Sequence, residues 1–96
     1  MRKKVVIESK VKETVFNSLL PFLEKNLPRV RGFTGCLNVT VFFDKESRKM
    51  IFDEEWVSVE AHQEYINTIA NNGVMDELIS FLDGPPEIKY LDCLDI

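Results

Sequence analysis

The sequence is poor in the residues that build metal centres and disulfide frameworks. Its 96 residues include one histidine, His62, and two cysteines, Cys36 and Cys93, whose spacing matches no metal-binding or redox motif. One chain therefore cannot supply a zinc site, and the sequence predicts no metal. The cysteines are best explained as reduced thiols in a cytoplasmic protein.

Long apolar runs are also missing. The basic start, Met1-Arg-Lys-Lys4, is followed by three apolar residues before Glu8, whereas an export signal needs roughly 7–15. With 45% hydrophobic and 29% charged residues, the composition is that of an ordinary globular protein, neither disordered nor membrane-spanning. We therefore expect no membrane partner and a cytoplasmic location.

Positive charge is in short supply as well. Twelve Lys and Arg residues against sixteen Asp and Glu residues give a net charge of −4, whereas binding to a phosphate backbone needs a surplus of basic residues. We expect no nucleic-acid partner. The basic residues are concentrated in residues 1–31, where we interpret them as a solvated surface.

The length indicates a single domain over residues 1–96. A domain of this size buries only roughly 60–65% of the surface of its unfolded chain, so its core is thin. Association with a second copy would bury more apolar surface and stabilise the fold. We therefore expect a homodimer.

Apolar periodicity divides the chain into seven expected elements, because alternation indicates strands and spacings of three and four indicate helices. Pro21 removes one hydrogen bond inside the first helical pattern, so a kink or break is expected near residues 17–21. Ser58 is expected to cap the second helix, and Asn71-Asn-Gly73 to stop it. In chain order, the expected elements are a strand over 3–11, a helix over 12–27 that ends before Pro28, strands over 36–43 and 49–57, a helix after Ser58, a short helix from Val74 that ends at Gly84-Pro-Pro86, and a strand over 87–94.

This order predicts an α+β fold of the ferredoxin-like kind, a four-stranded antiparallel sheet with helices on one face. Residues 36–43 and 49–57 have large apolar side chains on both faces, so both sides of the sheet should be covered. Helices would cover one side, and the other side needs a partner. Cys36 and Cys93 should lie on opposite edge strands, too far apart for a disulfide.

No nucleophile motif, phosphate-binding loop or metal-binding motif is present, so any reaction must depend on a pocket. Phe52, Glu54 and Trp56 alternate onto one strand face. His62 and Tyr65 lie three apart on the following helix, and the short turn between strand and helix brings the two groups together. We expect these five side chains to line a cavity between sheet and helix.

Each candidate has alternatives that the sequence leaves open. His62 is either a structural histidine or a base for a phenol, because an ordinary pKa of about 6.5 leaves it mostly neutral at pH 7. Glu54 is either a second base or the partner of a basic group. Trp56 belongs to the core, with or without a role as cavity wall. Tyr65 is a candidate orienting donor, and Asn38 on the second strand is a candidate substrate contact.

Three segments carry a resemblance to a known family. They are Leu27-Pro-Arg-Val-Arg-Gly-Phe-Thr-Gly-Cys-Leu37, Phe52-Asp-Glu-Glu-Trp-Val-Ser-Val-Glu-Ala-His-Gln63 and Gly84-Pro-Pro86. The most specific is the strand ending in Glu-Glu-Trp followed by Ser-x-Glu-Ala-His. Together they resemble the antibiotic-biosynthesis monooxygenase superfamily, and the match covers nearly the whole chain.

The resemblance implies a homodimer in which two ferredoxin-like sheets pack face to face as a dimeric α+β barrel. It also implies an enzyme that oxidises quinols or polycyclic phenols with molecular oxygen, without metal, flavin or any other cofactor. An electron-rich phenolate would reduce oxygen directly in a dry cavity, where the protein orients the substrate and stabilises negative charge. The implied partners are a second copy and a small aromatic substrate.

Residue by residue, the resemblance places Trp56 at the family's strand-end tryptophan, and His62 and Tyr65 at helix positions where relatives have Tyr or His. Phe52 stands where some members have Asn, and no arginine follows Arg48. The haem-degrading branch of the superfamily is not indicated, because its Asn, Trp and His are all missing. These departures leave an alternative open, a non-catalytic dimer that binds a small ligand or acts in a stress response on the same scaffold.

Overall fold

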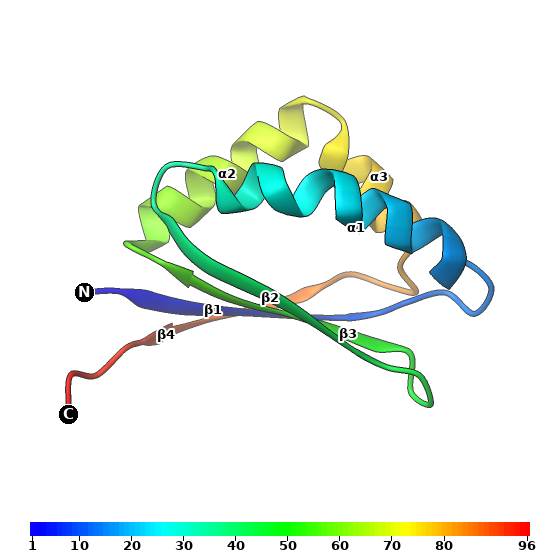
Figure 1. The fold of residues 1–96 in the computed structure, drawn as a ribbon, viewed down its shortest axis with the longest axis horizontal. Helices are drawn as coiled ribbons and strands as arrows, with labels where there is room; N and C mark the ends of the chain where they lie inside the picture. Colours follow the sequence, from blue (N-terminus) through cyan, green and yellow to red (C-terminus); the bar gives the residue numbers. More distant parts are fainter.

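The computed structural model describes residues 1–96, which form one sheet with three helices on one of its faces (Figure 1). In chain order the elements are β1 (Lys3–Lys10), α1 (Phe16–Arg31), β2 (Cys36–Asp44), β3 (Lys49–Trp56), α2 (Val59–Asn71), α3 (Val74–Ser80) and β4 (Glu87–Asp92). None of the helices combines the length and the apolar character needed to cross a bilayer.

The strands of the sheet lie in the order β2-β3-β1-β4, and every neighbouring pair is antiparallel. β1 and β3 therefore occupy the centre, while β2 and β4 are the edges. The predicted α+β architecture, a ferredoxin-like sheet with helices on one face, is confirmed. Cys36 lies on the β2 edge and Cys93 directly follows β4, so the two free thiols are on opposite edges as expected.

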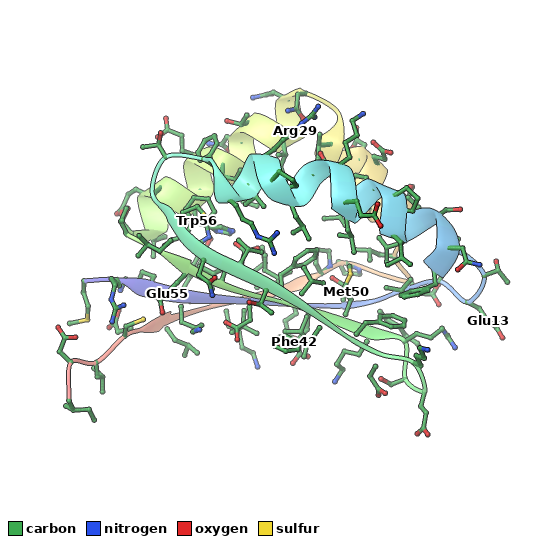
Figure 2. All side chains as sticks on the ribbon, viewed as in Figure 1. Glu13, Arg29, Phe42, Met50, Glu55 and Trp56 are labelled. Carbon is green, nitrogen blue, oxygen red and sulfur yellow. The ribbon has the colours of Figure 1, made fainter.

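β3 shows how alternation in the sequence positions the site. Met50, Phe52, Glu54 and Trp56 point toward the helices, and none is more than 8% exposed. Figure 2 shows Met50 and Trp56 between the sheet and the helices, with Phe42 on the opposite face. The predicted common face of β3 is confirmed, and it forms the floor beneath the helices.

α1 differs from the prediction, because it continues through Pro21 and Pro28 to Arg31. The expected end before Pro28 is wrong, and of the two alternatives near Pro21 the break is wrong while the kink stays a prediction. The buried face of α1 includes four large apolar side chains, Leu19, Phe22, Leu23 and Val30. Burying them stabilises the fold by roughly 1.5–3 kcal/mol each, which offsets a cost of about 3 kcal/mol for each proline.

A β-bulge reorients the first residues of β2. The register with β3 shifts between Cys36, which pairs with Trp56, and Asn38, which pairs with Glu55. Leu37 is the extra residue and is 50% exposed. Regular alternation would place Leu37 on the same face as Val39, but the bulge gives that place to Cys36, a residue packed against the core.

The face of the sheet away from the helices is uncovered in a single chain. Phe42 and Leu91 are each 53% exposed on it. Charged side chains on the same face pair across the strands, as Lys4 Nζ does with Asp53 Oδ1 at 2.7 Å. This open face therefore combines exposed apolar side chains with ion pairs.

Candidate functional site

A cavity of about 70 Å³ lies between the sheet and the three helices. Side chains of α1, α2 and α3 form one side, and side chains of β1, β3 and β4 form the other. The largely apolar wall includes Ile7, Phe22, Phe52, Ile69, Leu78 and Ile88. Three of the lining residues have polar groups in their side chains, and they are Asn26, Glu54 and Tyr65. A ligand in this cavity would meet one carboxyl group in apolar surroundings.

Glu54 is the carboxyl group on that wall. The alternation of β3 turns it toward the helices, where it is 4% exposed. Burial disfavours the charged form and raises the pKa of Glu54 to about 7, and the neighbouring charge of Asp53 acts in the same direction. Trp56 Nε1 opposes this shift by donating a hydrogen bond to Glu54 Oε1 over 2.7 Å. Glu54 therefore takes up and releases a proton near neutral pH.

The sequence leaves open whether Glu54 pairs with a basic group. Glu54 has one contact with a basic side chain, in which its Oε1 lies 3.7 Å from His62 Nε2. Neither lysine nor arginine neutralises it. No group of three His, Cys, Asp or Glu side chains that could hold a metal ion is present.

His62 lies behind Glu54, in the first turns of α2. The Ser58 Oγ accepts a hydrogen bond from the Ala61 backbone N–H over 3.1 Å, so the predicted N-cap is confirmed. His62 is fully buried, and its Nδ1 lies 2.8 Å from the hydroxyl of Tyr90. Burial lowers the pKa of His62 to about 4, so the imidazole is neutral at pH 7.

Trp56 and His62 do not line the cavity, contrary to the prediction. Both are fully buried, and their rings meet edge to face with centroids 5.2 Å apart. Phe33 and Tyr65 pack around the indole with centroids at 6.2 and 5.6 Å. These rings fill the space beneath the start of α2, so the cavity begins at Tyr65, about one turn further along the helix.

Tyr65 and Phe52 reach the cavity wall together with Glu54. Burial raises the pKa of Tyr65 to about 12, and the charge of Glu54 acts in the same direction, so the phenol keeps its proton and can donate a hydrogen bond. Asn38 lies apart from them, because it is exposed and pairs with Glu55 on the open face. The roles of these side chains toward a substrate stay predictions.

Sequence reasoning does not identify Tyr90 as part of the site. Tyr90 pairs with Val5 of β1 and shares its helix-facing side, which brings its hydroxyl to His62. The alternation of Ile88 and Tyr90 is visible in the sequence. Which face they occupy depends on the register of β4 against β1, and alternation alone does not fix that register.

No family model matches the sequence, and no curated protein matches it either. Among solved structures, a protein described as an antibiotic biosynthesis monooxygenase superposes with a TM-score of 0.84 at 18% identity, over 97% of this chain and 99% of its own. A Caulobacter crescentus protein, whose name assigns it provisionally to the same group, gives 0.85 at 21% identity, over 98% and 91%. A Mycobacterium tuberculosis protein gives 0.83 at 16% identity, over 100% and 98%.

These likenesses establish a fold that is shared over nearly the whole chain. At such identities they do not extend to activity or substrate. The predicted resemblance to antibiotic-biosynthesis monooxygenases is confirmed as a likeness of fold.

Proposed function

We propose that this protein is a cofactor-independent monooxygenase that oxidises a quinol-like or polycyclic phenolic small molecule with molecular oxygen. The observation that carries the proposal is Glu54, a carboxyl group with a pKa of about 7 on the wall of an apolar cavity. A general base works best when its pKa lies near the working pH. The fold shared with a protein described as an antibiotic biosynthesis monooxygenase supports the same assignment.

In the proposed reaction, Glu54 takes the hydroxyl proton of the substrate, and Tyr65 donates a hydrogen bond to the resulting phenolate oxygen. The phenolate passes one electron to O₂, and the two radicals join at an unsubstituted ring carbon as a peroxide. The O–O bond then breaks, and the inner oxygen stays as a carbonyl. The outer oxygen leaves as water with the ring carbon's proton and the proton held by Glu54. One phenol and one O₂ give one quinone and one water, without an outside reductant.

Trp56 and His62 act behind the cavity wall in this proposal. Trp56 holds the Glu54 carboxyl group in place through its indole N–H. His62 has a pKa of about 4 and does not line the cavity, so it is a weak base out of reach of a substrate there. We therefore assign the role of base to Glu54.

The present cavity is too small for an aromatic ring. An apolar cavity of roughly 150 Å³ accommodates benzene, whereas this cavity measures about 70 Å³. Binding of a quinol therefore requires the wall to move outward. We therefore propose an outward movement of the wall that admits the substrate, in addition to the oxidation.

The proposal includes a homodimer joined through the open faces of the two sheets, a dimeric α+β barrel. Phe42 and Leu91 are more than half exposed on this face and would become buried. Lys4 and Asp53 already pair within one chain, so each of them would keep its partner when this face is covered. A chain of 96 residues has a small apolar core of its own, and burying this face against a partner would add to that core.

Oxygen uptake with a panel of hydroquinones tests the proposed activity. The wild-type protein should consume O₂ faster than autoxidation does, and Glu54→Gln should lower this rate at least about 100-fold. Glu55→Gln is the matched control, because the neighbouring carboxylate faces the other side of β3, and it should keep the wild-type rate. A wild-type rate equal to autoxidation for every hydroquinone, or a full rate in Glu54→Gln, contradicts the proposal.

A second candidate function is non-catalytic binding of a small ligand. The small volume of the cavity and the burial of Trp56 and His62 away from it favour this alternative. Trp56 is the only tryptophan, and its ring centroid lies 5.6 Å from that of Tyr65, which lines the cavity. The fluorescence of Trp56 should therefore respond to a bound ligand. A saturating fluorescence change with no O₂ consumption assigns the protein to the binding class.

A further inference from the structure

The polar groups at the cavity continue beyond Glu54 to the surface. His62 Nε2 lies 3.7 Å from Glu54 Oε1, and on the other side of the same ring Nδ1 lies 2.8 Å from the Tyr90 hydroxyl. Tyr90 is 37% exposed on the edge strand β4. A line of three proton-carrying groups therefore runs from the cavity wall, through a fully buried imidazole, to solvent.

The imidazole has an unsatisfied atom on this line. His62 Nε2 is buried and has no hydrogen-bond partner, which is an unfavourable state for a polar atom in a protein interior. Hydrogen bonds of this type span about 2.7–3.2 Å, so a shift of roughly 0.5–1 Å toward Glu54 would satisfy it. The carboxyl group can serve as acceptor when ionised and as donor when protonated.

No positive charge competes for Glu54. The titratable groups that face it are His62 and Tyr65 from α2, Tyr90 from β4 and Cys36 from β2. Burial keeps the imidazole neutral and raises the pKa of each of the other three, so all four are uncharged at pH 7. Asp53, next to Glu54, faces the other side and pairs with Lys4. The other two helices contribute only uncharged side chains to the cavity wall, including the amide of Asn26 from α1 and apolar side chains from α3.

We propose that Glu54, His62 and Tyr90 form a proton relay through which the buried carboxyl group exchanges its proton with water. When Glu54 is ionised, His62 carries its proton on Nε2 and donates to the carboxylate, while Nδ1 accepts from the Tyr90 hydroxyl. A proton that reaches Tyr90 from water sends the hydroxyl proton to Nδ1 and the Nε2 proton to Glu54. His62 then donates from Nδ1 to Tyr90 and accepts at Nε2 from the carboxylic acid.

The reverse transfer returns Glu54 to its ionised form. One proton enters or leaves in each direction, and the imidazole is neutral before and after. The tautomer of His62 therefore follows the charge of Glu54. His62 and Tyr90 act through Glu54 as positioning residues and need not touch a substrate.

The use of the relay rests on the proposed function. In the proposed reaction Glu54 returns to its ionised form by giving its proton to the product water. With a pKa of about 7, Glu54 is also partly protonated before a substrate arrives, and the relay lets this resting form lose its proton to solvent. The relay itself requires no substrate, so it can be tested apart from the oxidation.

Nitrogen NMR of the ¹⁵N-labelled wild-type protein tests the relay directly, because His62 is the only histidine and its imidazole signals need no assignment. Between pH 5.5 and pH 9 the proton should move from Nδ1 to Nε2, with a midpoint near the Glu54 pKa of about 7. Glu54→Gln should abolish this midpoint, and Glu55→Gln should retain it. A single tautomer across the whole range, or an imidazolium signal at the midpoint, overturns the proposal.

Tyr90→Phe tests the outer end of the relay. Exchange of the His62 imidazole proton with water should slow at least about tenfold in this variant, whereas Lys89→Gln, on the opposite face of β4, should leave the exchange rate unchanged. An unchanged or faster exchange rate in Tyr90→Phe overturns the relay. If the tautomer change holds while no hydroquinone is oxidised, the proposed function fails and the relay stands. If oxidation occurs without the tautomer change, the relay alone fails.

Discussion

Glu54 concentrates the unusual chemistry of this molecule at one residue. Its carboxyl group is 4% exposed and receives a hydrogen bond from Trp56, but no lysine or arginine pairs with it. The folded chain therefore favours its protonated form, and the pKa rises to about 7. A residue chosen only for stability at this position would be apolar, since an unpaired buried carboxylate costs free energy.

Glu54→Gln should therefore change how stability depends on pH. Because the folded pKa of about 7 exceeds the ordinary value of 4.5, the folded state binds more protons between these limits and the free energy of unfolding falls as pH rises through them. Glutamine does not titrate, so this loss is absent from the variant. Between pH 4.5 and pH 8, the free energy of unfolding of the variant should therefore rise by about 3 kcal/mol relative to that of wild type. Urea unfolding at the two pH values measures it.

Glu55→Gln serves as the control, because Glu55 is partly exposed on the other face and pairs with Arg2. Its unfolding free energy should keep the wild-type pH dependence over this range. Parallel pH curves for wild type and Glu54→Gln would contradict the raised pKa.

Part of the site could be predicted from the sequence at the level of single residues. Period two on β3 places Phe52 and Glu54 under the helices, and period 3.6 on α2 places Tyr65 above them. Neither pattern reveals that the rings of Trp56 and His62 fill the intervening space, because that depends on side-chain packing. The raised pKa of Glu54 follows from the same packing.

At the scale of elements, the turn from α1 into β2 depends on a close contact. Gly35 has φ +91°, and a Cβ there would lie 2.7 Å from Ala61 Cβ and 3.0 Å from Val57 Cγ2. The same turn precedes the β-bulge that brings Cys36 opposite Trp56. Gly35 thus allows β2 to pass beneath the start of α2, the helix that carries His62 and Tyr65.

Gly35→Ala and Gly73→Ala separate backbone strain from this contact. Both glycines have φ near +90°, but a Cβ at Gly73 would meet nothing within 4 Å. Gly73→Ala should cost about 1–2 kcal/mol from the backbone alone, and Gly35→Ala should cost at least about 1 kcal/mol more from overpacking against Ala61. Thermal or urea unfolding gives both values, and equal losses would rule out a tight contact at Gly35.

Element boundaries depend on competition between local rules and packing. The sequence rule that proline ends a helix fails for α1, because the four apolar side chains of its buried face outweigh the lost hydrogen bonds. The cap at Ser58 and the end of α2 at Asn71 follow their local signals, since no opposing contact acts there. The bulge at Leu37 has no clear signal in the sequence, which alternates regularly through it.

For the whole molecule, the open face is the surface through which we propose that two chains pair. Phe42 stands at its β2 side and is 53% exposed (Figure 2). Phe42→Lys should convert the proposed dimer into a monomer at micromolar concentration, because a lysine buried against the partner would be an unpaired charge. Sedimentation equilibrium measures the change in mass.

Ile79→Lys supplies the control for that experiment. Ile79 is 45% exposed on α3, which covers the other face of the sheet. This variant should keep the mass of the wild-type protein. A wild-type protein that sediments as a monomer would contradict pairing through the open face.

The two prolines of α1 bear on how a ring could enter so small a cavity. Phe22, Leu23, Asn26 and Leu27 line the cavity from the segment between them. Proline lacks the amide hydrogen that would close a helical turn, so this segment is flanked by two weakened joints. Outward movement of this segment would open the cavity to solvent, and it would expose Phe22 and Leu23, which are buried while the cavity is closed.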